Sequence, residues 1–283
     1  MIIFDYNQVA ISNLMQQIGS SKGPVDESLV RHMILNTIRT YVKKFKESHG
    51  PEIVIACDNK NYWRREIFKH YKAGRRKARD SSGHDWNSIF ECLNKIRDEL
   101  KQFSPYKVID VETCEADDII ACICEYSSDD ILIIAGDKDY LQLHTRSNIK
   151  QYDPVNKRFL KTDCPKTFLH EHIIRGDQSD GVPNIASPDN CFVVGERQKK
   201  ITKKLMEQCK LIDFDMEHPL RRNYIRNKNL IDLSMIPIDL KQKVIEEYNN
   251  TPASHAKRTT REERTRFLFL VNSRQDVSSV QTS

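Results

Sequence analysis

Acidic side chains follow four short apolar runs of this 283-residue chain. One acid stands after each of the first two runs, three after the third and two after the fourth. Crowded carboxylates repel one another, and a hard divalent cation such as Mg²⁺ removes that penalty because it prefers carboxylate oxygens and water. Two such ions about 3.5–4 Å apart could flank a phosphate, one activating water and one stabilising the leaving oxygen. The acids are Asp5, Asp58, Glu115, Asp117, Asp118, Asp137 and Asp139.

Buried parallel strands would carry these acids to one place. The four runs are rich in Ile and Val and do not alternate with polar residues, as expected for strands covered on both faces. Helical patterns separate them, and this alternation predicts a doubly wound parallel sheet whose strands end at one edge, where ligands bind. The acids should therefore meet in one cleft. The runs cover 2–4, 53–57, 106–109 and 131–135, and the helical patterns cover 25–46, 86–103 and 115–125.

Each acid taken alone has a simpler interpretation. One Asp after a strand is usually a turn former or a helix cap, and Asp117 and Asp118 could merely favour a helix N-terminus. Acids at all four strand ends together favour a divalent-metal site. On an ideal helix Glu115 and Asp118 share a face while Asp117 points away from it, although first-turn side chains can bend toward a cleft.

A basic stretch with aromatic residues among its cations follows Asp58. Five of its cations step by four, three, four and three residues, which suits one helix face, and Gly74 makes that helix breakable. Phosphates can pair with such charges while bases stack on the rings, so the stretch predicts contact with single-stranded nucleic acid. A solvated surface is the alternative. The stepped cations are Arg65, Lys69, Lys72, Arg76 and Arg79, and Arg64, Tyr71, Arg75 and Lys77 belong to the same stretch.

Composition limits the class of protein. The net charge of +5 favours a polyanionic partner without proving one. No stretch approaches the roughly 18 apolar residues of a membrane span, and the opening MIIFDYN has neither a basic leader nor an apolar run of signal length. We therefore expect a cytoplasmic protein (in the host cytoplasm if a phage encodes it) that makes no membrane contact. Its eight cysteines are expected to be reduced core residues rather than zinc ligands.

Ordered motifs make the sequence resemble the 5′-nuclease superfamily, which includes the flap endonucleases. E-A-D-D and G-D-x-D are each common, but in this order, with the basic stretch between the second and third acids, they are specific. The resemblance runs over roughly the first two-thirds of the chain. It implies an α/β fold with a parallel-sheet, PIN-like 5′-nuclease core, a helical arch and a smaller C-terminal helical region. The matches are IIFDYNQVAIS, VRHMILNTI, ACDN, YWRREIFKHYKAGRRKAR, CEADDIIA, ILIIAGDKDYLQLH and RGDQSDGVP.

The resemblance implies which acids bind metal. It selects Asp117 and leaves Asp118 doubtful. The turn GDQSDGVP adds Asp177 and Asp180, which match acids that complete a second metal site, partly through water. The implied cofactor is Mg²⁺ at two sites, with Mn²⁺ as a plausible substitute. The implied metal ligands are Asp5, Asp58, Glu115, Asp117, Asp137, Asp139, Asp177 and Asp180.

The resemblance also implies roles within the basic stretch. Tyr71, Lys72 and Arg75 match the Y-K-x-x-R of the family's arch. There the Lys contacts the reacting phosphate, the Arg supports it and the Tyr can stack on a terminal base. The implied catalytic residues are Lys72, Arg75, Asp117 and Asp137. The implied nucleic-acid contacts are Arg64, Arg65, Lys69, Tyr71, Lys72, Arg75, Arg76, Lys77 and Arg79.

One segment departs from the family pattern. Members commonly continue from the second acidic motif through G-I-G-x-K-T into a helix–hairpin–helix that grips duplex DNA and often binds K⁺. Here the text is GDQSDGVPNIASPDNCFVVGERQKK, with Gly181 in place of the usual Asn and no G-I-G-x-K-T, as in phage members of the superfamily. Neither a K⁺ site nor particular duplex-binding residues are therefore implied.

The expected activity is two-metal phosphodiester hydrolysis by a 5′→3′ nuclease that removes RNA primers and adjacent DNA and cleaves 5′ flaps during lagging-strand replication. The substrates would be branched, nicked or RNA-primed duplexes, and single-strand-binding protein and a sliding clamp are possible partners of what we expect to be a monomer. Alternatives are a PIN-type ribonuclease and a DNA-structure-binding protein with a degenerate site. The expected domains are a nuclease core at 1–165, with its arch at about 62–85, and a helical DNA-binding region at 166–283 that completes the metal site and has a flexible tail at 273–283.

Overall fold

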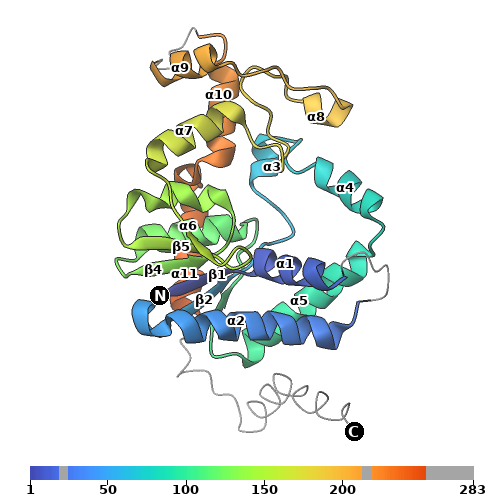
Figure 1. Cartoon of the computed structure of the whole chain (residues 1–283), viewed down its shortest axis with the longest axis vertical. Helices are drawn as coiled ribbons and strands as arrows, with labels where there is room; N and C mark the ends of the chain where they lie inside the picture. Colours follow the sequence, from blue (N-terminus) through green and yellow to red (C-terminus); the bar gives the residue numbers. More distant parts are fainter. Residues whose placement is uncertain (19–24, 212–217, 253–283) are drawn as a thin grey trace.

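Five parallel strands and one antiparallel edge strand form the sheet of the computed structural model (Figure 1). The structure describes residues 1–18, 25–211 and 218–252. The strand order is β3-β2-β1-β4-β5-β6, and β6 runs antiparallel to β5. The strands are β1 (Ile2–Asp5), β2 (Ile53–Ala56), β3 (Lys107–Ile109), β4 (Ile131–Ile134), β5 (Ile149–Asp153) and β6 (Arg158–Leu160).

The four strands expected from the apolar runs are confirmed, and β5 and β6 extend the sheet beyond them. The residues of β1, β2 and β4 are all buried, which matches their unbroken apolar sequence. Strand β5 reads IKQYD, and its exposed Lys150 and buried Gln151 break that pattern. Polar residues therefore hid β5 from an interpretation based on apolar runs.

The strand order reverses beside β1. From β1 the chain moves outward through β2 to β3, and it then crosses back to β4 on the other side of β1. Ligands of parallel α/β sheets bind at the carboxyl ends of the strands beside such a reversal. The register pairs Asp5 with Ala56 and Phe4 with Ile134, so the three strands end side by side. The residues that directly follow β1, β2 and β4 therefore lie close together at the carboxyl edge of the sheet.

Three helices cover one face of the sheet: α1 (Tyr6–Ile18), α2 (Glu27–His49) and α5 (Trp86–Phe103). The predicted helices at 25–46 and 86–103 are thus present. Helix α5 begins where the carboxylate of Asp85 accepts hydrogen bonds from the backbone N–H groups of Asn87 and Ser88 at 3.1 and 3.2 Å. Its buried residues recur at helical spacing and pack on the sheet.

Helices α6 (Ala116–Tyr126) and α11 (Ile238–Asn250) cover the other face. Ile119, Ile120 and Ile123 of α6 belong to the same buried cluster as Leu240 and Val244 of α11. The last described helix of the chain therefore packs inside the α/β core. The division into regions 1–165 and 166–283 stays a prediction, and the tail at 273–283 lies outside the described residues.

Three helices of the second half of the chain gather beyond one end of the sheet. Figure 1 shows α7 (Pro165–Arg175), α9 (Lys203–Leu211) and α10 (Arg221–Ile231) grouped together, with the four-residue α8 (Cys191–Val194) apart from them to the right. Ile174, Ile185, Met206 and Cys209 form a small separate core there. The 3₁₀ helix η1 (Lys138–Thr145) follows β4 in the chain and packs against α7. The 3₁₀ helix η2 (Leu233–Met235) leads into α11. Within the described ranges, no helix has the length and apolarity needed to cross a membrane.

The basic stretch forms two short helices, α3 (Arg64–Ile67) and α4 (Gly74–Ser82), so the prediction of one continuous helix face is wrong. The segment between them turns, and Lys72 takes a left-handed backbone conformation with φ of 55°. An L-residue adopts that conformation at a cost, and its neighbours must hold it there. Gly74, expected as the breaking point, instead begins α4. Figure 1 shows α4 standing away from the sheet.

Candidate metal centre

The predicted acids of the sheet lie at the ends of the strands. Asp5 is the last residue of β1, and Asp58 follows β2 by two residues. Asp117 lies in the first turn of α6, and Asp137 precedes η1, where its carboxylate accepts a hydrogen bond from the backbone N–H of Asp139 at 3.0 Å. Because the three parallel strands end together at the reversal beside β1, these acids lie at one edge of the sheet, where the sequence predicts them.

A buried tyrosine joins two of these acids. The hydroxyl of Tyr140, which is 0% exposed, lies 2.6 Å from the Asp117 carboxylate and 3.0 Å from the Asp5 carboxylate. A phenol carries one hydrogen and can donate to one of them at a time. Burial, followed by the charge of Asp58, raises the pKa of Asp5 to about 7, and burial and the charge of Asp137 raise the pKa of Asp117 well above its usual range. These two carboxylates thus crowd together without a directly bound cation among the described residues.

Backbone and amide donors hold Asp58. One carboxylate oxygen accepts from the backbone N–H of Ala116 at 2.7 Å, and the other accepts from the side-chain amide of Asn7 at 2.7 Å. The first contact ties the end of β2 to the first residue of α6. Helix α6 thereby stays in register with the strand ends, and Asp117 one residue later is held at the cleft.

Cations from the basic stretch hold a second group of acids. Lys72 forms an ion pair with Glu115, and its ammonium nitrogen lies 3.5 Å from the Asp180 carboxylate. Arg75 lies 2.5 Å from the same Asp180 carboxylate. The Tyr71 hydroxyl lies 2.8 Å from both Glu115 and Asp180. Three residues predicted to contact substrate therefore lie against predicted metal ligands.

A backbone contact fixes this arrangement. The N–H of Lys72 donates to the carbonyl oxygen of Asp180 at 2.7 Å, which supports its left-handed conformation. The next residue of the acidic turn is Gly181 with φ of 72°, and a Cβ added there would lie 3.1 Å from the carbonyl oxygen of His70. A glycine thus lets the turn 177–182 approach the basic stretch closely.

Asp118 is fully buried and pairs with Arg64. Arg64 is 3% exposed, and its guanidinium nitrogens lie 2.8 Å from Asp118 and 2.9 Å from Glu115. The indole N–H of Trp63 also donates to Asp118 at 3.0 Å. This environment agrees with leaving Asp118 out of the predicted ligands. It differs from the nucleic-acid contact predicted for Arg64, because that side chain is enclosed between α6 and the backbone of Leu230.

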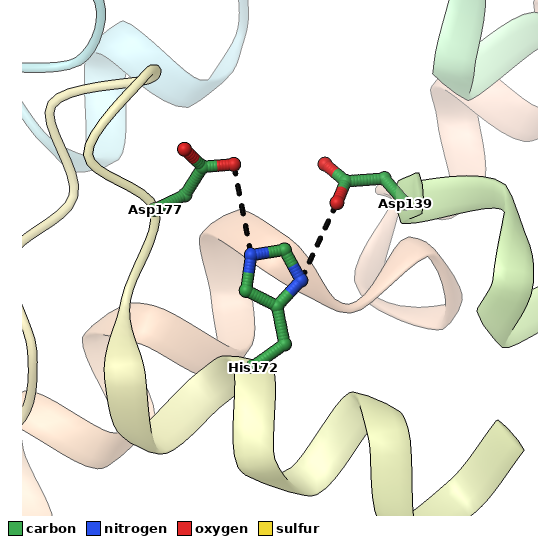
Figure 2. Close-up of side chains that lie close together, drawn as sticks. All are labelled: Asp139, His172 and Asp177. Atoms are coloured by element: carbon green, nitrogen blue, oxygen red, sulfur yellow. Dashed lines mark ion pairs between the residues drawn. The ribbon is translucent and has the colours of Figure 1, made fainter. Parts of the chain in front are cut away.

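A histidine that the sequence analysis did not single out lies between two predicted ligands (Figure 2). In His172 of α7, Nδ1 lies 3.3 Å from Asp139 and Nε2 lies 3.6 Å from Asp177. Burial, then the charge of Asp137, raises the pKa of Asp139 to about 8. Burial also acts to raise the pKa of Asp177, but contacts with His172 and Ser179 outweigh it and hold that pKa well below its usual range. The sequence signal was weak, because a histidine four residues before GDQSD gains meaning only when α7 packs on η1.

A small cavity of about 10 Å³ lies where α6, η1 and the acidic turn 177–182 meet. Four predicted ligands line it, and they come from α6, η1 and the acidic turn. Carboxylates crowded in a buried site cost free energy unless cations or protons compensate them. The raised pKa values of Asp5, Asp117 and Asp139 express that cost. Oxygen donors in this number fit hard divalent cations. The four are Asp117, Asp139, Asp177 and Asp180.

The other cations of the basic stretch lie nearer the surface. Arg65 and Lys69 are exposed, and Arg65 lies over the ring of Tyr62 at 4.9 Å. Half-buried Arg79 lies 4.6 Å from the centre of the Phe90 ring. The side chains of Arg76 and Lys77 lie outside the described residues. Cations near aromatic rings at the surface are compatible with the nucleic-acid contact predicted for residues 62–85, which stays a prediction.

Known proteins share this sequence pattern and fold. The family model of the 5′-3′ exonuclease N-terminal, resolvase-like domain matches residues 14–171. Ribonuclease H of Enterobacteria phage T4 is 34% identical over 265 residues, which is 88% of this chain and 86% of that protein. A 5′-3′ exonuclease of Buchnera aphidicola is 27% identical over 75% of this chain and 79% of its own length.

Solved structures share the fold. The T5 5′-exonuclease with divalent zinc ions bound matches with a TM-score of 0.63 at 15% identity, over 89% of this chain and 98% of that chain. A bacteriophage T5 flap endonuclease in a pseudo-enzyme–product complex with DNA and metal ions matches with a TM-score of 0.62 at 15% identity, over 88% of this chain and 99% of that chain. At such low identity the likeness shows the fold, which confirms the predicted α/β, mainly parallel architecture.

Proposed function

Since this chain belongs to the 5′-3′ exonuclease family, we propose that it is a Mg²⁺-dependent 5′→3′ nuclease that removes RNA primers and adjacent DNA and cleaves 5′ flaps during lagging-strand replication. The observation that carries the proposal is the convergence of acids from α6, η1 and a distant turn on one small cavity, with the acids at the ends of β1 and β2 bonded to residues of α6 and η1 beside it. The ribonuclease H and the exonucleases named above support the choice of nucleic acid as substrate.

The proposed ligands divide between two Mg²⁺ sites, with Mn²⁺ as a substitute. The acids at the strand ends and on α6 would hold one ion, and those of η1 and the turn 177–180 would hold the second. Bound ions of this kind activate water and stabilise the leaving oxygen of a phosphodiester. The full set is Asp5, Asp58, Glu115, Asp117, Asp137, Asp139, Asp177 and Asp180.

Lys72 and Arg75 are proposed to neutralise the reacting phosphate. In the structure both lie against carboxylates of the candidate site, so their charges are already at the cleft. A phosphate oxygen that enters the cleft would exchange with a carboxylate as the partner of each cation. Charge held in place for the transition state lowers the barrier because little reorganisation is needed during the reaction.

The arch is proposed to guide the 5′ end of the substrate. Arg65, which lies over the ring of Tyr62, and Lys69 are exposed and can pair with phosphates of a single strand. Tyr71 is 3% exposed and bonded to two acids, so stacking on a terminal base would require it to leave them. We further propose that region 166–283 binds the duplex and that the protein acts as a monomer, with single-strand-binding protein and a sliding clamp as partners.

Cleavage of defined substrates tests the proposal. Labelled 5′-flap, nicked and RNA–DNA hybrid duplexes are incubated with the protein and Mg²⁺, Mn²⁺ or EDTA. We expect 5′-phosphate products that shorten from the 5′ end with either metal and no product with EDTA. A duplex with blocked 5′ ends serves as the matched control. Binding of flap DNA without cleavage under any metal condition would instead support a degenerate site.

A further inference from the structure

The imidazole of His172 is the nitrogen donor within the candidate centre. Its two ring nitrogens face different carboxylates, Nδ1 toward Asp139 at 3.3 Å and Nε2 toward Asp177 at 3.6 Å (Figure 2). Nδ1 is buried and has no hydrogen-bond partner among the described residues. One ligand atom from each of the three residues can be chosen so that all lie within 4.8 Å of one another. Ligands on one ion at about 2.1 Å are at most about 4.2 Å apart, so only a small closure is required.

The chemistry of the ring explains why this arrangement favours a cation. A neutral imidazole carries a hydrogen on one nitrogen and a lone pair on the other. Ionised carboxylates only accept hydrogen bonds, so beside a neutral ring one of the two flanking carboxylates faces a lone pair. In the metal-free protein a proton can lie between the ring nitrogen and that carboxylate. A metal ion bound between them would take the place of this proton. A histidine that binds metal commonly donates its other N–H to a carboxylate, which fixes the ring orientation.

We propose that His172 binds the second divalent metal ion through Nδ1 beside Asp139, while its Nε2–H donates to Asp177. This inference rests on the proposed function and deepens it. It makes Asp177 a positioning residue for the ring rather than only a ligand. The second site then offers nitrogen as well as oxygen donors. The first site, built around Asp5 and Asp117, offers oxygen donors alone within the described residues.

A mixed donor set changes which metals bind best. Carboxylates suit Mg²⁺ and Mn²⁺, whereas imidazole favours the later divalent ions of the first transition row. The second site should therefore bind Zn²⁺ more tightly than Mg²⁺, with Mn²⁺ between them, and the first site should show a smaller difference between these ions. Occupancy of the two sites would then depend on which divalent ions are available.

Pulsed electron paramagnetic resonance on the Mn²⁺-loaded full chain tests the proposal. The protein without DNA is titrated to two equivalents of Mn²⁺, and the echo modulation is recorded for nitrogen coupled to the ion. We expect ¹⁴N modulation of the strength given by a directly bound imidazole. In protein made with [¹⁵N]histidine, the ¹⁴N pattern should disappear. This comparison uses the wild-type sequence, so it holds even where a variant fails to fold.

Two variants of α7 locate the ligand. His172→Gln should lose the nitrogen modulation and weaken Mn²⁺ binding at one site at least about tenfold, with a smaller effect on Mg²⁺. His170→Gln is the matched control, because His170 contacts the Cys209 carbonyl oxygen and the Tyr224 hydroxyl and faces none of these acids. It should keep both the modulation and the affinity.

Two results would overturn the inference. The first is an absence of nitrogen modulation in the wild type with both sites filled. The second is modulation that persists in His172→Gln. Either result, obtained with protein that cleaves flap DNA in Mg²⁺, rejects the role of His172 and leaves the proposed function intact. Normal nitrogen modulation in a protein that cleaves no substrate would support the role of His172 and reject the proposed nuclease function.

Discussion

The candidate centre treats its acids in two ways. In the phenol-bridged half, Asp5 and Asp117 share the hydroxyl of Tyr140 and have no directly bound cation among the described residues. In the cation-paired half, Glu115 and Asp180 are held by Lys72 and Arg75. The residue types are the same, but their charge is balanced differently. The charge of the first half is compensated by a proton or by an ion from solution, whereas the second already has cations of the chain.

The two halves also differ in how they are built. The phenol-bridged half stands on β1, α6 and η1, which belong to the central core. The cation-paired half joins α6 to a turn and to a segment between two short helices. The Tyr140 hydroxyl is fully buried in the core, whereas Lys72 and Arg75 contact their carboxylates through long side chains that an entering phosphate could engage. We infer that the first half sets metal geometry and that the second responds to substrate.

The largest effect is expected where an acid of the phenol-bridged half loses its charge. Asp117→Asn keeps the size of the side chain and its contact with Tyr140, so the fold should survive. Single-turnover cleavage of flap DNA in Mg²⁺ should fall by at least about 10³-fold, while flap DNA still binds. Asp137→Asn should behave alike. Asp129→Asn, on an exposed turn, is the control, and wild-type rates in Asp117→Asn would reject the assignment.

The next effect concerns the cation enclosed behind the cation-paired half. Arg64→Met leaves Glu115 and Asp118 in the interior without their guanidinium partner. The free energy of unfolding, measured with urea, should fall by about 3–5 kcal/mol. Arg65→Met changes the exposed neighbour and should lie within about 0.5 kcal/mol of wild type. Equal stability of the two variants would show that Arg64 is not needed to compensate these acids.

Lys72 tests whether cations of the second half act on the substrate. Lys72→Ala should lower the single-turnover rate by about 10²-fold and change flap affinity much less, because the charge is needed most in the transition state. Lys69→Ala removes an exposed cation of the same segment and should affect affinity more than rate. Weaker binding with an unchanged rate in Lys72→Ala would place this lysine among the ordinary phosphate contacts.

The smallest effect is a pH dependence of stability that comes from the phenol-bridged half. Burial and the charge of Asp58 raise the pKa of Asp5 to about 7, so the native state holds a proton that the unfolded chain releases above about pH 4. The metal-free protein should therefore lose stability as pH rises from about 4 to 7, by at least about 1.4 kcal/mol. Urea unfolding at several pH values measures this loss. Saturating Mg²⁺ should abolish it, and a stability that rises across this window would contradict the shift.

The sequence predicted the sheet-edge acids well because two local features suffice for them. Apolar runs mark buried strands, and parallel strands end at one edge, so Asp5, Asp58 and Asp137 needed no knowledge of distant contacts. The resemblance added Asp177 and Asp180, and both line the cavity that Asp117 and Asp139 also line. Their roles as ligands stay predictions.

Distant contacts explain what the sequence did not reveal. Tyr140 was not singled out from the sequence, because its bridge between two acids depends on how β1 and α6 meet. The basic stretch looked helical from its spacing, yet the carbonyl oxygen of Asp180, more than 100 residues later, holds Lys72 in a left-handed turn. His172 required the packing of α7 on η1. None of these contacts leaves a local pattern.

Helix α11 has a consequence for how the protein is made. The ribosome finishes every strand long before it reaches Leu240 and Val244, which complete the buried cluster over α6. Until then the outer face of α6, the helix that begins beside Glu115 and carries Asp117, lacks the apolar side chains of α11 that pack on it. In a nascent chain, Glu115 and Asp117 therefore lie on a helix whose outer face is not yet fully packed. We infer that the candidate metal centre is completed only after α11 has been synthesised.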